Sequence, residues 1–120
     1  MEHLRRSETG AKPKANLKLL HSQGVKIAVG TDTFGKIEPG VSTVRELELM
    51  VESGLPPSDV IQAATQNAAE HLGLAKDLGT VESGKIADLI IVEGDPLKDI
   101  SSLHKMKIVV QAGRVVHVAP

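Results

Sequence analysis

The sequence predicts an α/β fold in which a helical part, residues 1–75, precedes a smaller all-β part, residues 76–120. Three observations support this division. Residues 14–31 read as a helix, a glycine and a strand, which is the helix-to-strand half of an α/β unit. Two amphipathic helical patterns then follow, up to residue 74. After Lys76, short β-branched runs between glycine and proline replace the helical patterns.

The composition limits the classes of function. The chain has 120 residues and a formal net charge of −1, so no basic surplus is present to bind a nucleic-acid backbone. No apolar run approaches the roughly 20 residues of a membrane span, and we expect no membrane partner. The lack of cysteine excludes disulfides and thiolate metal sites and fits a cytoplasmic location. Phe34 is the single aromatic residue, so each residue can bury little apolar surface on average. This indicates a chain that is not complete on its own.

The first elements are a helix and a strand. Residues 1–11 are polar and are expected to be loose, with Pro13 in the first turn of a helix that ends at Gly24. Val25 to Thr31 alternates in hydrophobicity as a strand does. The strand leads directly to a single carboxylate, Asp32, between two threonines.

Two helices follow the loop after Asp32. Thr43 and Glu46 form a capping-box pattern at the start of the first helix. Ser58 is the expected N-cap of the second, which ends at Gly73. The apolar faces predicted to be buried are Val44, Leu47, Met50 and Val51 in the first helix, and Ile61, Ala64, Ala68 and Leu72 in the second.

The all-β part contains three predicted strands. Ile86 to Val92 is apolar on both faces apart from Asp88, as expected of a buried strand. Residues 107–118 form two β-branched runs joined through Gln111-Ala112-Gly113, which predicts a hairpin. Gly79 and Gly84 mark turns before these strands.

Four motifs in series resemble the C-terminal portion of the metal-dependent amidohydrolases, in the branch that contains imidazolonepropionases and Xaa-Pro dipeptidase-like enzymes. They span most of the chain after residue 12 and are GVKIAVGTDT, RELELMVESGLPPSDVIQAATQNAAEHLGL, LGTVESGKIADLIIVEGDPL and IVVQAGRVV. The resemblance implies the terminal part of a TIM-like (β/α)8 barrel followed by C-terminal strands of a composite β-sandwich. Val25 to Thr31 would be the last barrel strand, and Asp32 would lie at its C-terminal end, where barrel enzymes place their chemistry.

The resemblance assigns Asp32 two roles, as a metal ligand and as the catalytic general acid/base. The implied cofactor is a divalent metal, with zinc expected, and the implied partner is a small-molecule amide substrate whose pocket Thr33 and Phe34 would border. From the residues alone, an Asp beside glycine after a strand is more often a turn residue. A phosphate loop is rejected for GTDTFG because the Gly-Lys-Ser/Thr ending is missing.

The other metal ligands that the family requires are not recognisable in the sequence. The five histidines, none at His-x-His spacing, are His3, His21, His71, His104 and His117. A catalytic zinc needs about three protein ligands, so we expect no metal to bind tightly to this chain alone. The chain would then be a fragment lacking an N-terminal segment or a truncated reading frame, and a homo-oligomer if it folds alone.

Two functions remain open at this stage. The first is a C-terminal segment of a metal-dependent hydrolase acting on non-peptide or dipeptide-like C–N (amide) bonds. The second is a truncated, non-catalytic oligomerising or binding module derived from that family. The retained GTDT sequence favours the first, and the lack of metal-binding histidines favours the second.

Overall fold

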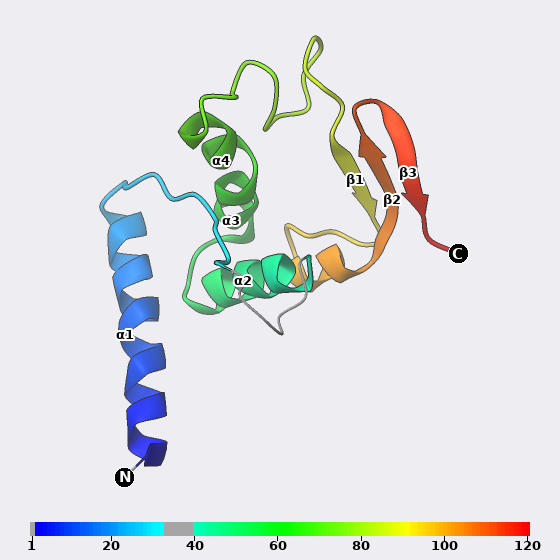
Figure 1. The fold of residues 1–120 in the computed structure, drawn as a ribbon. Helices are drawn as coiled ribbons and strands as arrows, with labels where there is room; N and C mark the ends of the chain where they lie inside the picture. Colours follow the sequence, from blue (N-terminus) through cyan, green and yellow to red (C-terminus); the bar gives the residue numbers. More distant parts are fainter. Residues whose placement is uncertain (1, 33–39) are drawn as a thin grey trace.

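The computed structural model describes residues 2–32 and 40–120, with side chains from Lys12 onward. Helices precede strands along the chain, so the predicted α/β order is confirmed (Figure 1). The elements are α1 (Glu2–Ser22), α2 (Val41–Glu52), α3 (Pro57–Ala64), α4 (Gln66–His71), β1 (Leu89–Val92), the 3-10 helix η1 (Ile100–His104), β2 (Met106–Gln111) and β3 (Arg114–Val118). The helix α1 extends away from the other helices, and the strands lie on the opposite side of the molecule (Figure 1).

The helix α1 is longer than the sequence predicted. It begins at Glu2 and continues through Pro13, so the expectation of loose residues is wrong for 2–11. Proline removes one backbone donor from a helix interior, but Lys, Arg, Ala and Leu on both sides favour the helix. The second half of α1 docks on the body: Leu17 packs against the core, and Lys14 Nζ lies 3.0 Å from Glu52 Oε2.

An ion pair joins α1 to α3. Nε2 of His21, in the last turn of α1, lies 2.8 Å from Oδ2 of Asp59. This hydrogen bond, with a second from the Ser58 hydroxyl, lowers the pKa of Asp59 from its ordinary value. The sequence placed His21 near a helix end but did not predict its partner.

The helix α2 supplies one wall of the core. Val44, Leu47 and Met50 are buried and Val51 is partly buried, which confirms the predicted stripe. The helix begins at Val41 after Gly40, and Thr43 lies inside it, so the predicted capping box is wrong. The buried cluster is completed by Leu55, Val60, Ala63, Ile100 and Leu103.

The second predicted helix is broken. At Thr65, φ is −124° and ψ is −87°, and this residue separates α3 from α4. The helix α3 also starts earlier than expected, because Pro56 is the N-cap and Pro57 the first helical residue in place of Ser58. The break changes the buried face: Val60, Ala63 and Ala69 are buried, whereas Leu72 is 69% exposed. The predicted face is thus confirmed in part, since Ile61 and Ala64 pack against the core, and is wrong for Leu72.

The segment from Val25 to Thr31 has no strand assignment. Ile27 and Val29 pack against the core, as the alternation indicated, but the backbone bonds to helices and not to a β-ladder. The predicted strand is therefore wrong for this structure, since a strand needs a hydrogen-bonded neighbour. The TIM-like barrel and the composite β-sandwich remain predictions.

The three strands form one antiparallel sheet in the order β1-β2-β3. The hairpin β2–β3 is confirmed, and Ala112 (φ 49°) with Gly113 (φ 77°) gives the two positive φ values of a tight hairpin turn. The predicted strand Ile86–Val92 is shorter, at Leu89–Val92, and it is not buried, since Ile90 and Ile91 are each about half exposed. Both faces of β1 are thus partly open to solvent.

A single buried cluster joins the two predicted parts of the chain. Ile100 and Leu103 of η1 pack into the same core as α2 and α3. The α-helices lie before residue 76 and the sheet lies after it, but this shared core means that the division into two domains, 1–75 and 76–120, remains a prediction. Within residues 2–32 and 40–120, no helix has the length and apolar character needed to cross a membrane.

Two glycines with the same backbone conformation allow a matched test of how the loop after α4 packs. Gly79 (φ 94°) approaches the α3–α4 junction so closely that a Cβ would lie 2.7 Å from Ala69 Cβ and 3.1 Å from the Thr65 carbonyl oxygen. Gly84 (φ 92°) has nothing within 4 Å of such an atom. We expect Gly84→Ala to lower the free energy of unfolding by about 1–2 kcal/mol, from backbone strain alone. Gly79→Ala should lower it by about 1–3 kcal/mol more, because the added methyl group also clashes with Ala69 and Thr65. Urea unfolding of both variants measures these changes. Equal losses of unfolding free energy in the two variants would contradict the close packing of Gly79 against the α3–α4 junction.

The Asp59–His21 pair predicts a pH dependence of stability. A carboxyl with a lowered folded pKa stabilises the fold above its unfolded pKa, about 3.9, and this stabilisation is lost as the pH falls through the folded value. The free energy of unfolding should thus fall more steeply below about pH 4 in the native protein than in Asp59→Asn. A double-mutant cycle with His21→Gln should give a larger coupling at about pH 5 than at about pH 3. A coupling that does not change with pH would contradict this assignment.

Candidate functional site

The candidate catalytic residue, Asp32, is an exposed carboxylate after the Val25–Thr31 segment. Its φ is 43°, in the left-handed region that Asp tolerates better than most residues. Such a conformation is compatible both with a turn residue and with a strained functional position. Thr33 and Phe34, the expected border of the substrate pocket, lie outside the described residues.

Three contacts from α3 and α4 hold the backbone that leads to Asp32. The amide of Val29 donates to the Ala63 carbonyl oxygen at 3.2 Å. The side-chain amide of Asn67 donates from Nδ2 to the Ile27 carbonyl oxygen at 2.8 Å, and this contact is partly buried. Lys26 forms an exposed ion pair with Glu70. The sequence analysis did not single out Asn67.

The histidines are distributed over separate elements. His104 lies in η1, and its Nε2 is 2.9 Å from Glu48 Oε1 of α2. His71 is in the last turn of α4, and His117 is exposed in β3. The hydrogen bonds from Arg45, and then from His104, lower the pKa of Glu48. His21 and His104 therefore serve as partners of carboxylates between elements, whereas the side chain of His3 is not described.

The described residues do not fit a complete metal centre. No group of three or more His, Asp or Glu side chains in the described ranges could hold an ion. A catalytic zinc requires about three protein ligands with one open position. Asp32 could supply one of these ligands, so no reaction step through a metal is assigned to the residues described.

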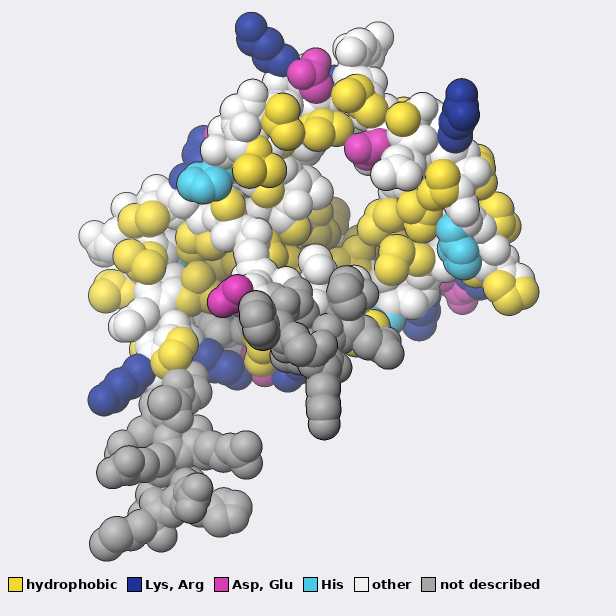
Figure 2. All heavy atoms as spheres, viewed as in Figure 1, with side chains coloured by type: hydrophobic (Ala, Val, Ile, Leu, Met, Phe, Trp, Pro, Cys, Tyr) yellow, Lys and Arg dark blue, Asp and Glu magenta, His cyan; other side chains and the backbone are white. Residues whose placement is uncertain are grey.

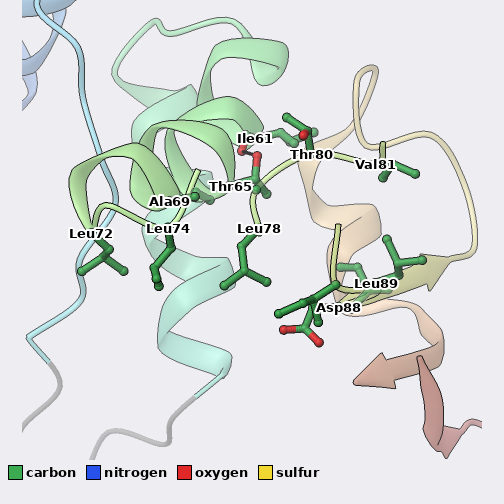
Figure 3. A pocket seen from close by; sticks show the side chains of 14 residues that line it. Ile61, Thr65, Ala69, Leu72, Leu74, Leu78, Thr80, Val81, Asp88 and Leu89 are labelled. Carbon is green, nitrogen blue, oxygen red and sulfur yellow. Dashed lines mark hydrogen bonds between the residues drawn. The ribbon is translucent and has the colours of Figure 1, made fainter. Parts of the chain in front are cut away.

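A hollow of the described surface lies between the helices and the sheet. It has a volume of about 520 Å³ and is lined mainly by aliphatic side chains of α3, α4, β1 and the loop between α4 and β1 (Figure 3). Figure 2 shows this hollow as an opening between the helical part and the strands. Asp88, the single titratable residue among those that line it, accepts a hydrogen bond from the Ala112 amide at 2.8 Å and so ties β1 to the hairpin turn. The hollow is therefore an apolar packing surface without a catalytic pair.

The sequence matches known hydrolases along most of its length. The profile of the Amidohydrolase family matches residues 4–116. The chain is 30% identical over 110 residues to imidazolonepropionase of Shouchella clausii, a match that covers 85% of this chain and 24% of that protein. It is 42% identical over 88 residues to ochratoxinase of Aspergillus niger, covering 72% of this chain and 18% of that protein.

The structure agrees with these matches. A crystal structure of a Xaa-Pro dipeptidase with bound methionine in the active site superimposes with a TM-score of 0.80 at 39% identity, over 88% of this chain and 25% of that one. The chain thus spans about a quarter or less of the length of these relatives. The family profile covers nearly all of the sequence, and the chain belongs to the amidohydrolase family.

Proposed function

We propose that this chain is the C-terminal segment of a metal-dependent hydrolase that cleaves C–N bonds of small amides. The observation that carries the proposal is the family match over residues 4–116, which includes the GTDT sequence around Asp32. The relatives named imidazolonepropionase and Xaa-Pro dipeptidase point to a cyclic amide or a dipeptide-like substrate.

Asp32 carries the chemistry of this proposal. As a carboxylate it would give one oxygen ligand to a divalent metal, zinc being the expected ion. It would also accept the proton of the attacking water and return it to the leaving nitrogen, which is general acid/base work suited to a positioned carboxylate. The remaining ligands would come from polypeptide other than the residues described.

A chimeric enzyme tests the role of Asp32. In it, this chain replaces the matching C-terminal quarter of the Shouchella clausii imidazolonepropionase, and turnover of that enzyme's substrate is measured. Asp32→Asn should lower kcat by at least about a hundredfold, because the proton acceptor is lost while the shape is kept. Asp95→Asn, the same change in an exposed turn, is the control. Unchanged turnover in Asp32→Asn, with an unchanged circular dichroism spectrum, would refute the role.

A second candidate function, an oligomerising module, is favoured by the exposed sheet. One face of the sheet presents aliphatic side chains from all three strands, which are Leu89, Ile91, Ile108, Val110, Val115 and Val118. The accessible surface is 8999 Å², whereas a compact monomer of this mass has about 6,200 Å². Part of this excess belongs to α1, which extends away from the other helices (Figure 1), so the aliphatic sheet face and not the total area carries this candidate. A second copy of this uncharged face would cover it without like-charge repulsion.

Size-exclusion chromatography with light scattering tests whether the isolated chain forms an oligomer. At about 100 μM the isolated chain should elute as a dimer or larger species, because apolar surface favours burial. Val118→Lys, on the aliphatic face, should shift the protein toward monomer. His117→Lys, the adjacent residue on the opposite face, is the control and should not. A wild-type monomer at every concentration would exclude this candidate.

A further inference from the structure

In the structure described, the short segment between Val25 and Asp32 is attached to helices and pairs with no strand of the described residues. Its backbone hydrogen bonds in the described structure run to α1 and to the α3–α4 junction: Val25 to the Leu20 carbonyl at 3.1 Å, and Val29 to the Ala63 carbonyl at 3.2 Å. These contacts therefore contribute to the position of the carboxylate at the end of the segment.

The break at Thr65 provides two of the contacts. Ala63 is among the last residues of α3, where carbonyl groups lack intrahelical partners, so its oxygen is available to Val29. Asn67 lies in the first turn of α4, and its side chain reaches the Ile27 carbonyl at 2.8 Å. One helix junction therefore binds the segment at Ile27 and again at Val29.

The position of the carboxylate depends closely on this attachment. Val29 and Asp32 are three residues apart, so at most about 11 Å of chain separates their Cα atoms. Gly30, between them, adds no side chain that could be fixed by packing. The short separation means that a movement of the segment at Ile27 and Val29 also moves Asp32, although Gly30 allows some independent motion.

We propose that Asn67 is a positioning residue for Asp32, acting through its hydrogen bond to the Ile27 carbonyl; this inference rests on the proposed function of Asp32. Asn67 touches neither substrate nor metal in this role. It fixes the segment on one side, so that the carboxylate keeps one location during the reaction. The hydrogen bond from Asn67 to the Ile27 carbonyl is partly buried. Loss of this bond would leave a partly buried polar group without its partner, which is unfavourable.

The ion pair between Lys26 and Glu70 provides a matched control. It also joins the segment to α4, but Lys26 is 63% exposed, and exposed pairs contribute little to stability. Glu70→Gln removes this pair without touching the backbone contacts. Asn67→Asp keeps the shape of Asn67 but cannot donate at neutral pH, whereas Asn67→Leu removes the amide altogether.

Amide hydrogen exchange and ¹⁵N relaxation of this chain give the first measurement. In Asn67→Asp and Asn67→Leu, exchange of the Val29 amide should rise about fivefold to tenfold, and the order parameter of the Asp32 amide should fall. Glu70→Gln should leave both unchanged. An Asp32 amide equally ordered in all four proteins would overturn the proposal.

The chimeric enzyme gives the second measurement. Per folded protein, both Asn67 variants should lower kcat by about a hundredfold and change KM by less than about threefold, since the reacting group is misplaced while substrate binding is kept. Normal kcat in these variants, with an inactive Asp32→Asn, would overturn the proposal and leave the function of Asp32 intact. An active Asp32→Asn would overturn the proposed function itself. If no chimera is active, the relaxation data decide.

Discussion

The non-helical backbone at Thr65 is the constraint on which the arrangement of this molecule depends. It frees the Ala63 carbonyl for the Val29 amide and turns Asn67 toward the Ile27 carbonyl. It also leaves the space into which Gly79 packs, within contact distance of the Thr65 carbonyl and Ala69. A continuous helix through Thr65 would remove all three contacts at once. The loop before the sheet and the segment before Asp32 are thus positioned by the same junction.

The elements that the sequence predicted well are those stabilised by their own pattern. The stripe of α2 is defined by three buried residues one helical turn apart, and the hairpin by a two-residue turn with positive φ at both positions. The elements predicted wrongly depend on neighbours. Hydrophobic patterns typical of strands buried in a sheet occur at Val25–Thr31 and Ile86–Val92. Such a pattern indicates that apolar neighbours are needed, but not which elements supply them. In this structure the first segment is bound by helices and the second lies half exposed.

The candidate site shows the same division. Asp32 was predicted as a site residue because the GTDT sequence resembles a family motif, whereas the residue types alone favour a turn residue. Its role stays a prediction. Asn67 was not predicted, because hydrogen bonds between residues distant in sequence leave no periodic signal. One signal was present: an amide in the alanine-rich stretch AATQNAAEH is unfavourable for a helix unless it marks a cap or finds a partner. Asn67 finds a partner, since its side chain binds the Ile27 carbonyl, whereas the N-cap of α4 is Thr65.

The helix contacts described for residues 25–29 lie on one side of the segment before Asp32. Ile27 and Val29 face the core, and α3 and α4 supply the hydrogen bonds, while Lys26 and Ala28 are exposed between them. A barrel strand needs hydrogen-bonding neighbours on both of its edges, so the predicted barrel would require further strands beside this segment. The sheet has the same character, with an aliphatic face that its own chain leaves open. Under the proposed function, Asp32 would share a metal with ligands from other polypeptide. An attachment of its segment to α3 and α4 on one side would leave the other side for those ligands.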